Sequence, residues 1–533
     1  MKLKCALIFV TLVSVLAVSL APAAADGHCP QEGGTFTIGV DTFLPMDPNT
    51  AAHDWTFYAI TNINSMLFRI ESGQPVGDLA ESWDISEDGT VYTWHIRPGM
   101  MWHDGNEIFP EGESREVTAH DVVYSIYRQY DDESSIMAAD LRNLFVSAEA
   151  TDDHTVVLTL SGPDAIMYDK ARGLTFTAIV AKEAIDHYGD DYGLNPLGSG
   201  PFEFVSYSPD EEVVLRANED YYIDPCLDEV IFRVMPDVPA AMIALEAGDI
   251  DWWGAVTPGD DVGRFLDNED MTVINFGCPV ATRLYMSVDK PPFDDVRFRK
   301  ALSHMKDGEA INAALRGPTH VKGAGTAGPG VAGYVEGLYD EYHAYDPELA
   351  MSLMDEIGIV DSDGDGWREF EGELLEIPMF SWNSDPAPDY VAAMVDAGEQ
   401  VGLRIRPEIA DPGTNNARRL DGEWGIYLGQ GWCGEGGTNA LWGRNGWISS
   451  LGYVDEEIFS LLDQSAQNLN EEEREAQLQA ATTRVAELYF EPAFGFFNIF
   501  TVKNNYVKDF FGGEWTLNLA TDDHNVWINE DER

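Results

Sequence analysis

The sequence predicts a mixed α/β protein built from at least two lobes. Short apolar–polar alternation, which is typical of strands, is followed repeatedly by apolar residues spaced three to four apart, which is typical of helices. The chain has 533 residues, and 44% of them are hydrophobic, which is enough for two to four domains with extensive cores. No fixed-period repeat and no long linker is found, so the domain boundaries must follow from topology rather than from composition.

Strand patterns open the chain beyond its N-terminal segment. Residues 33–41 alternate apolar and polar side chains, which predicts a strand. Residues 83–96 predict a hairpin, because two alternating runs flank a Glu-Asp-Gly turn. The period then changes to that of a helix over residues 117–130, with Thr118 as the expected N-cap.

Strands and helices alternate through the rest of the chain. Among the helices, the one over residues 237–251 should be stopped by Gly248, since glycine is common at helix C-termini. We expect further strands at residues 154–160, 198–207, 228–236 and 284–289, and further helices at 295–305, 346–358, 388–402 and 470–490.

The N-terminus has the pattern of a secretory signal peptide. Two lysines precede an apolar run, residues 6–20, and a small-residue cleavage site ends near Ala25. No later stretch approaches the roughly 20 apolar residues of a membrane span. Cys29 follows Gly-His rather than a leucine-rich lipidation motif, which argues against a lipid anchor. We therefore expect a soluble protein of the periplasm.

The charge balance is strongly acidic, with 93 Asp and Glu against 32 Lys and Arg and a formal net charge of −61. Nucleic acid and anionic membranes are unfavourable partners for such a surface. Salt would screen the self-repulsion, since the Debye length falls to ~3 Å at 1 M. A saline habitat is one interpretation, and an acidic periplasmic protein from an ordinary source is the other.

Four cysteines remain beyond the predicted cleavage site. An even number of cysteines in an exported protein indicates disulfides before it indicates catalysis. Three pairings are possible, and their spacing alone selects none. The four are Cys29, Cys226, Cys278 and Cys433.

Two sequences imitate known binding motifs. Residues 323–328, GAGTAG, fit a dinucleotide-binding pattern, but Pro329-Gly330 follows and blocks the helix that the phosphate would need, so we expect a loop. The stretch from residue 361 places Asp361, Asp363 and Asp365 as in a calcium loop, yet position 12 is glycine. An acidic turn between helix and strand is favoured, with a weak surface calcium site as the alternative.

Motifs for catalysis are missing from the sequence, while aromatic residues suggest recognition. The chain contains no HExxH, Walker or G-x-S-x-G motif. Rings in loops between lobes can stack on ligands, and the pair Trp252-Trp253 follows a predicted helix stop. Most of the 14 tryptophans should nevertheless pack in cores. Four lie in or beside irregular stretches of the second half, namely Trp382, Trp432, Trp442 and Trp447.

Eight segments in a fixed order resemble the extracellular solute-binding proteins of family 5, which include the oligopeptide- and dipeptide-binding components of ABC importers. The most specific is LAESWDISEDGTVYTWHIRPGMMWHDG, residues 79–105. The others are VTAHDVVYSIYR (117–128), NPLGSGPFEFVSY (195–207), LRANEDYY (215–222), the segment 228–251, the segment 284–311, YDPELAMSLMDEIG (345–358) and the GWCGE bend (431–435).

The resemblance implies a two-lobed periplasmic binding protein fold, type II and cluster C-like, with three domains and a hinge. Domains I and II would form one lobe and domain III the other. The implied boundaries are 1–25 for the signal peptide, 26–68, 197–280 and 500–533 for domain I, 69–196 for domain II and 281–499 for domain III.

The resemblance also implies the function and the partners. A solute, most plausibly an oligopeptide or another amine-bearing compound, would bind between the lobes and close them, and a membrane permease would recognise the closed form. A separate subunit hydrolyses ATP, so this chain would be a monomeric binding protein with no enzymatic activity, no cofactor and no nucleic-acid partner.

The site residues follow from the same resemblance. In oligopeptide-binding members an acid after such a bend holds the α-ammonium group of the peptide, and Glu435 occupies that position. A family disulfide would join Cys278 to Cys433, which would leave Cys29 with Cys226. The other expected ligand contacts are Trp432, Cys433, Gly434, Trp382, Asn383, Asp41 and Trp442.

Two departures from the family limit the choice of ligand. Dipeptide-binding members place an arginine at the start of the helix matching residues 388–402, and none occurs here, which argues against strict dipeptide specificity. Glu435 also replaces the usual aspartate. A neutral solute such as an oligosaccharide is the alternative within the class, and a secreted hydrolase using carboxylates or Cys433 is the alternative outside it. A free, alkylatable Cys433 would favour the hydrolase.

Overall fold

The computed structural model describes most of the chain beyond residue 28. The described ranges are 29–51, 54–71, 74–132, 134–135, 138–168, 177–257, 259–275, 277, 279–431, 435–444, 446–514, 516–521 and 524–533. The predicted signal peptide, Cys278 and residues 432–434 therefore lie outside the described residues. Along the described ranges, no helix combines the length and the apolar character needed to cross a membrane.

The first sheet has seven strands around β1, which pairs in parallel with β10 and β11. The expected strands at 33–41 and 228–236 are confirmed as β1 and β10, and α6 ends at Gly248, whose φ of 75° suits glycine. The sheet order is β12 (Met271–Asn275), β21 (Phe500–Asn504), β11 (Trp252–Trp253), β1 (Thr35–Val40), β10 (Glu229–Val234), β9 (Glu212–Ala217) and β8 (Phe202–Ser208), and its helices are α1 (Asp54–Ile63), α6 (Val238–Ala247) and α7 (Gly259–Leu266).

Trp252 and Trp253 belong to this sheet and not to a ligand-binding loop. They form β11, and both side chains are fully buried among the apolar residues beneath β1. The suggestion that these rings contact a solute is therefore wrong. Gly39 and Gly254 leave room for the two indole rings. A Cβ at Gly39, for example, would lie 2.9 Å from the Trp253 ring.

A four-stranded antiparallel sheet packs beside the first one. Its hairpin β4–β5 confirms the prediction for residues 83–96. Thr118 precedes α2, and its backbone N–H donates to the Asp121 carboxylate at 2.9 Å, which fixes the start of the helix. The elements are β4 (Ala80–Ile85), β5 (Val91–Ile96), β7 (Thr155–Leu160) and β6 (Phe145–Asp152), with α2 (Ala119–Asp131), α3 (Ala138–Leu144), α5 (Lys182–Tyr188) and η2 (Gly189–Leu194).

The third sheet has six strands and a core of its own. Its order is β14 (His320–Val321), β20 (Ala493–Phe497), β13 (Val280–Met286), β19 (Ile426–Gln430), β17 (Glu376–Trp382) and β18 (Arg404–Ala410). Around it lie α8 (Val296–His304), α9 (Gly308–Arg316), η3 (Gly317–Thr319), α10 (Leu338–Tyr342), α11 (Pro347–Glu356), α12 (Ala387–Gln400), α13 (Pro412–Leu420), α14 (Glu435–Trp442), η4 (Ser449–Leu451), α15 (Glu456–Gln467) and α16 (Glu471–Glu487).

Four two-stranded ladders complete the described secondary structure. The GAGTAG segment, residues 323–328, forms a loop as expected, with no helix after it. The ladders pair β2 (Phe68–Glu71) with β3 (Gln74–Gly77), β15 (Glu369–Phe370) with β16 (Glu373–Leu374), β22 (Val507–Lys508) with β25 (Trp527–Ile528), and β23 (Phe511–Glu514) with β24 (Thr516–Asn518).

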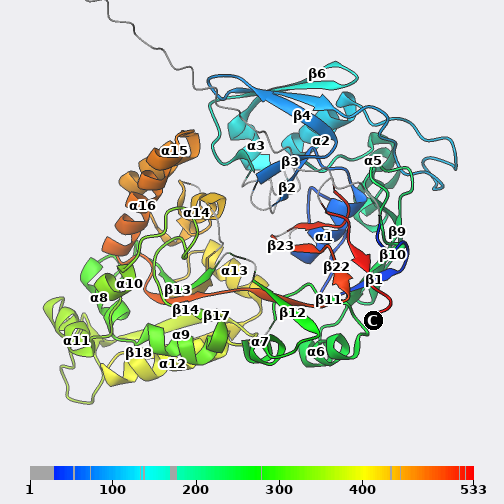
Figure 1. Cartoon of the computed structure of the whole chain (residues 1–533). Helices are drawn as coiled ribbons and strands as arrows, with labels where there is room; N and C mark the ends of the chain where they lie inside the picture. The colour runs from blue at the N-terminus through cyan, green and yellow to red at the C-terminus, as the bar shows by residue number, and fades with distance from the viewer. Residues whose placement is uncertain are drawn as a thin grey trace, which may run out of the picture.

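These sheets form two lobes (Figure 1). Lobe one contains the seven- and four-stranded sheets, and lobe two contains the six-stranded sheet with helices α8 to α16. Within the described ranges the chain crosses between the lobes from β12 to β13 and back from β20 to β21. A disulfide between Cys29 and Cys226 ties the start of the described chain into lobe one, and this is the pairing expected for these two cysteines.

Candidate functional site

The carboxyl ends of three strands in lobe two meet at one edge of the six-stranded sheet. β17 is parallel to β18 and to β19, so Trp382, Ala410 and Gln430 end these strands on the same side. Ligands of open α/β sheets bind at such an edge. We call it the carboxyl edge. Figure 1 shows α13 and α14, which follow two of these strands, on the side of lobe two that faces lobe one.

Three helices begin at the carboxyl edge, which gives it a polar character. α12 begins at Ala387, α13 at Pro412 and α14 at Glu435, each a few residues beyond its strand. The first N–H groups of a helix point away from its body and favour negative charge or hydrogen-bond acceptors. The edge can therefore receive carbonyl or carboxylate oxygens of a solute.

The two described ends of the predicted bend, Gly431 and Glu435, lie at this edge, after β19 and at the start of α14. Trp432, Cys433 and Gly434 fall outside the described residues, as does Cys278, so their ligand contacts and the Cys278–Cys433 bond stay predictions. Glu435 is the first residue of α14. Its ammonium-binding role stays a prediction.

A buried ion pair forms the floor beneath the bend. Arg283 of β13 pairs with Glu491, and both side chains are only 1% exposed. The Arg283 guanidinium lies against Gly431, where a Cβ would approach its Nη2 to 2.2 Å. Gly431 therefore has no room for a side chain. The glycine before the bend is explained by the arginine beneath it.

Trp382 and Asn383 come directly after β17 on the carboxyl edge. The Trp382 ring is half-buried against the core of lobe two, and Asn383 is exposed. In lobe one, Asp41 follows the carboxyl end of β1, and its Oδ1 accepts a hydrogen bond from the Trp55 indole at 2.7 Å. All three residues remain predicted ligand contacts, with Asp41 already holding one structural bond.

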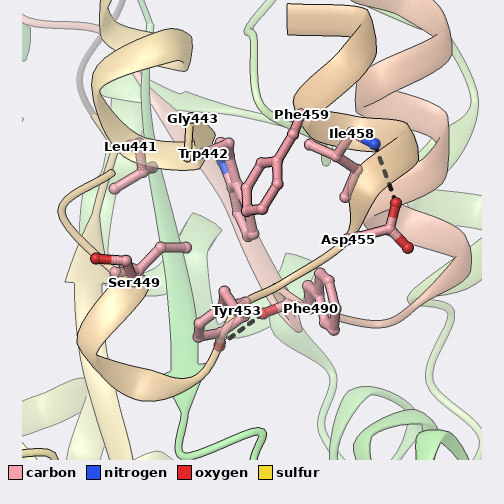
Figure 2. Close-up of a pocket in the computed structure, with 10 residues that line it drawn as sticks. Leu441, Trp442, Gly443, Ser449, Tyr453, Asp455, Ile458, Phe459 and Phe490 are labelled. Atoms are coloured by element: carbon pink, nitrogen blue, oxygen red, sulfur yellow. Dashed lines mark hydrogen bonds between the residues drawn. The ribbon is translucent and has the colours of Figure 1, made fainter. Parts of the chain in front are cut away.

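Trp442 requires a correction, because the structure places it in the core. It ends α14 and is 3% exposed, with its ring stacked on Phe490 at 6.3 Å and edge-on to Tyr453 at 5.5 Å (Figure 2). The neighbouring cavity of about 10 Å³ has room for at most one water. Trp442 cannot stack on a solute, and we remove it from the expected contacts.

Trp447, by contrast, is 43% exposed. The guanidinium of Arg419 lies 3.8 Å from the centroid of its ring, and the same guanidinium donates to the Trp447 carbonyl oxygen. This arrangement holds the ring in place by a cation–π contact while one face stays accessible. Trp432 lies outside the described residues, and of the other three tryptophans that the sequence analysis placed in irregular stretches, Trp447 is the most exposed.

Arg316 is a candidate that sequence reasoning missed. It ends α9, and its guanidinium lies 3.6 Å from the centroid of the Phe497 ring. Nε donates to the Tyr390 hydroxyl at 3.3 Å, and Nη2 is buried without a hydrogen-bond partner. No described carboxylate pairs with it, and burial lowers the pKa of the guanidinium, with Tyr390 opposing that shift. The guanidinium of Arg316 thus keeps hydrogen-bonding capacity that the described residues do not use.

Two contacts place Arg316 near both lobes. Tyr390, its hydrogen-bond partner, lies in the first turn of α12 and so next to the carboxyl edge. The backbone carbonyl of Arg316 faces Gly259 at the start of α7 in lobe one, where a Cβ would lie 2.7 Å from that oxygen. Arg316 therefore stands at the seam between the lobes.

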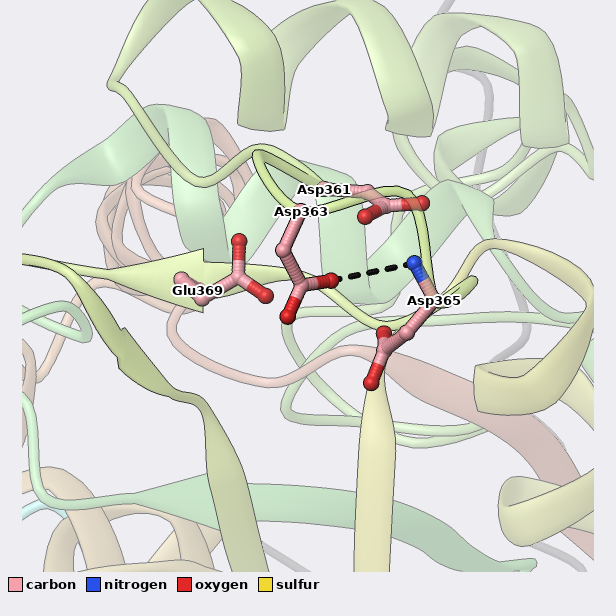
Figure 3. A group of neighbouring side chains, drawn as sticks. All are labelled: Asp361, Asp363, Asp365 and Glu369. Atoms are coloured by element: carbon pink, nitrogen blue, oxygen red, sulfur yellow. Dashed lines mark hydrogen bonds between the residues drawn. The ribbon is translucent and has the colours of Figure 1, made fainter.

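The acidic turn after α11 gathers four carboxylates (Figure 3). One oxygen from each of Asp361, Asp363, Asp365 and Glu369 lies within 4.8 Å of the others. Glu369, which the sequence analysis did not include, is the fourth member of this group. Backbone N–H groups of Gly364 and Gly366 donate to Asp361, so the turn is already satisfied by its own backbone. A strand follows, β16 and then β17, as expected.

Comparisons with known proteins agree with this architecture. The profile of the bacterial extracellular solute-binding proteins, family 5 Middle, matches residues 74–447. The dipeptide-binding protein of Escherichia coli is 28% identical over 389 residues, which are 69% of this chain and 70% of that protein. The heme-binding protein A of Haemophilus influenzae is 29% identical over 428 residues, 74% of each chain.

Solved structures share the fold. The periplasmic binding protein DppA of Helicobacter pylori, in complex with the peptide STSA, superposes with a TM-score of 0.77 at 22% identity and covers 93% of this chain and 98% of its own. The oligopeptide-binding protein AppA of Bacillus subtilis, in complex with a nonapeptide, gives a TM-score of 0.78 at 19% identity and covers 94% and 100%. The two-lobed fold predicted from the sequence is confirmed.

Proposed function

Since this chain belongs to family 5 of the bacterial extracellular solute-binding proteins, we propose that it is the substrate-binding component of an ABC importer and that it captures a peptide between its lobes. Relatives whose names or structures include peptides support that choice of solute. The protein works as a monomer in the periplasm after loss of its signal peptide. It delivers its solute chemically unchanged to a membrane permease and needs no cofactor.

The observation that carries the choice of a peptide is the unpaired Arg316. A chain with 93 acidic residues has carboxylates available almost everywhere, yet none in the described ranges pairs with this half-buried guanidinium. A solute that brings its own carboxylate would satisfy the buried Nη2 and recover the free energy lost on burying the charge. Arg316 at the seam would thus bind the C-terminal carboxylate that no arginine at the start of α12 is present to hold.

Glu435 supplies the opposite charge for the other end of the same solute. It begins α14 on the carboxyl edge, and its carboxylate would accept hydrogen bonds from the α-ammonium group. A peptide carries an ammonium at one end and a carboxylate at the other, so it would satisfy both residues. The helix N-termini at this edge would receive its carbonyl oxygens.

Closure then follows from contacts made to both lobes at once. A solute that binds only one lobe stabilises the open and the closed arrangement equally and shifts nothing. A peptide held by lobe two and covered by β1 and Asp41 of lobe one binds the closed arrangement more tightly. The free energy that the peptide gains by also contacting lobe one is what shifts the population toward the closed arrangement.

A thermal-shift comparison of matched ligands tests the function. Tetra-alanine, its N-acetylated form, its C-terminal amide and maltotriose are each added to the purified protein. A ligand present at 100 times its Kd raises the free energy of unfolding by about 2.7 kcal/mol, and we expect this from free tetra-alanine and less from either blocked form. Stabilisation by the sugar and by none of the peptides would refute peptide binding. It would still be consistent with a substrate-binding component of an importer.

Glu435→Gln sharpens the assignment of the ammonium site. We expect a loss of about 1.5–3 kcal/mol in binding of free tetra-alanine, typical of a hydrogen bond to a charged group, and little change for the acetylated form. Calorimetry measures both. Glu471→Gln, an exposed glutamate at the start of α16 in the same lobe, is the matched control. Equal affinities of Glu435→Gln and this control would remove Glu435 from the site.

A further inference from the structure

The two lobes touch at a second place, far from the crossings between β12 and β13 and between β20 and β21. The backbone N–H of Ala165, in the four-stranded part of lobe one, donates to the carbonyl oxygen of Ala466 in lobe two at 2.8 Å. In Figure 1 the upper end of α15 reaches toward α3, on the opposite side of the interlobe space from the crossing strands. The lobes are thus joined at both ends of that space.

The lobe-two side of this contact is a turn that we call the corner, residues 466–470 between α15 and α16. The carbonyl of Ala466 lies in the last turn of α15, where a helix leaves its carbonyls without internal partners. Arg474 donates to the carbonyl of Asn468, and the Asn470 side chain caps α16. These hydrogen bonds hold the corner in place, and the carbonyl oxygen of Ala466 remains available to accept a hydrogen bond from lobe one.

The lobe-one side is the tip, which consists of Gly89 in the β4–β5 turn and residues 161–165. The backbone N–H of Ser161 donates to Leu144 at 2.8 Å, and that of Ile166 to the buried Asp164 carboxylate at 3.2 Å. These bonds fix the tip as firmly as the corner. Because the tip and the corner are each held by their own hydrogen bonds, we expect the contact between them to form and break as a whole.

Leu469 provides the apolar part of the contact. Its side chain is 52% exposed, and its Cδ1 approaches Gly89 so closely that a Cβ there would lie 2.8 Å away. Gln467 approaches Gly162, with its Oε1 3.9 Å from where a Cβ would lie. One backbone hydrogen bond and a half-exposed leucine form a small contact, which thermal motion can break and re-form.

We propose that the tip and the corner form a latch that favours the closed arrangement of the lobes and so raises the affinity for every solute by a common factor. The inference rests on the proposed function, because it takes closure to accompany solute binding. When only a fraction of molecules is in the binding-competent state, the apparent Kd is the intrinsic Kd divided by that fraction. The latch touches neither Glu435 nor Arg316, so it changes affinity without changing selectivity.

Leu469→Ala is the first test. Removing the apolar contact lowers the closed fraction, and we expect it to weaken binding of tetra-alanine and of any other ligand that binds by the same factor, about two- to five-fold. Val454→Ala, a 68% exposed residue of the same lobe away from the tip, should leave these affinities unchanged. Unchanged affinities in Leu469→Ala, or a changed ranking of ligands, would overturn the latch.

The second test does not depend on a ligand. In the Ala165→Cys/Ala466→Cys variant the two backbones are close enough for a disulfide, and its formation under copper-phenanthroline is followed by mass spectrometry. We expect the bond to form without ligand, faster with tetra-alanine, and more slowly when Leu469→Ala is added. Failure to form under any condition, or a rate that Leu469→Ala leaves unchanged, would refute the latch. If no peptide binds, the proposed function fails, and the ligand-free rates still decide on the latch.

Discussion

Two arginines of lobe two, the fully buried Arg283 and the half-buried Arg316, differ in what surrounds them. Arg283 has Glu491 beside it, and the pair is sealed beneath Gly431. Arg316 is held between aromatic rings with one hydrogen bond and no carboxylate. A shortage of acidic residues cannot explain why, of the two, only Arg283 has a described carboxylate partner, because the chain has a net charge of −61. The paired arginine serves the architecture, while the one without a described carboxylate partner is our proposed place for the carboxylate of a solute.

Arg299 shows that the lack of a carboxylate alone would not mark a site. Burial lowers the pKa of its guanidinium too, but that guanidinium donates to the backbone carbonyls of Phe293, Asp294 and Leu488. Its hydrogen-bonding capacity is largely used inside the protein. Arg316 differs because its buried Nη2 has no such acceptor, and this difference makes it a binding candidate.

Breaking the paired arginine should give the largest effect. Arg283→Met leaves the Glu491 carboxylate buried and alone, which should lower the free energy of unfolding by about 3–5 kcal/mol. The double variant Arg283→Met/Glu491→Leu should recover most of the loss, since an apolar pair of similar volume removes both charges. Urea denaturation at neutral pH measures all three proteins. A single variant within about 1 kcal/mol of the parent would show that the pair is not sealed from water.

Removing Arg316 should affect solute binding more than the stability of the fold. Arg316→Met removes no internal ion pair, so stability should change little, while binding of free tetra-alanine should weaken by about 1.5–3 kcal/mol. The C-terminal amide, which lacks the carboxylate, should bind the variant and the parent equally. Arg444→Met, an exposed arginine of lobe two paired with Glu456 and Asp463, is the control. Equal losses for peptide acid and peptide amide would contradict carboxylate binding by Arg316.

The sequence alone did not predict that Arg283 forms an internal ion pair while Arg316 has no described carboxylate partner. Strands such as β1 and β10 and the end of α6 at Gly248 were predicted, because alternation and helix-stop chemistry are local. Arg316 acquires its meaning from Tyr390, 74 residues away, and Trp442 loses its expected role because α14 turns its ring into the core. Burial depends on contacts distant in the chain. Local patterns predicted the elements, whereas the carboxyl edge and the state of each charge required the fold.

A buried lysine, Lys306, extends the comparison to pH. Its side chain is 1% exposed, its Nζ donates to the Ala493 carbonyl at 2.8 Å and lies 4.9 Å from the centroid of the Phe494 ring. Burial lowers its pKa from 10.5 to about 7, and Asp307 only partly opposes this. Like Arg316, Lys306 has no paired carboxylate, but unlike arginine it can release its proton.

The lowered pKa of Lys306 predicts how stability should change with pH. Between pH 7 and 10.5 the unfolded chain holds this proton and the folded chain does not, so the free energy of unfolding rises with pH by at most about 1.4 kcal/mol per unit. Lys306→Met should lack that contribution, and the difference in slope between variant and parent isolates it from the other titrating groups. Burial also lowers the pKa of the neighbouring His304 and His343 below 6.5, so they titrate beneath this window. Parallel stability curves for the two proteins from pH 7 to 10 would mean that Lys306 keeps its proton when folded.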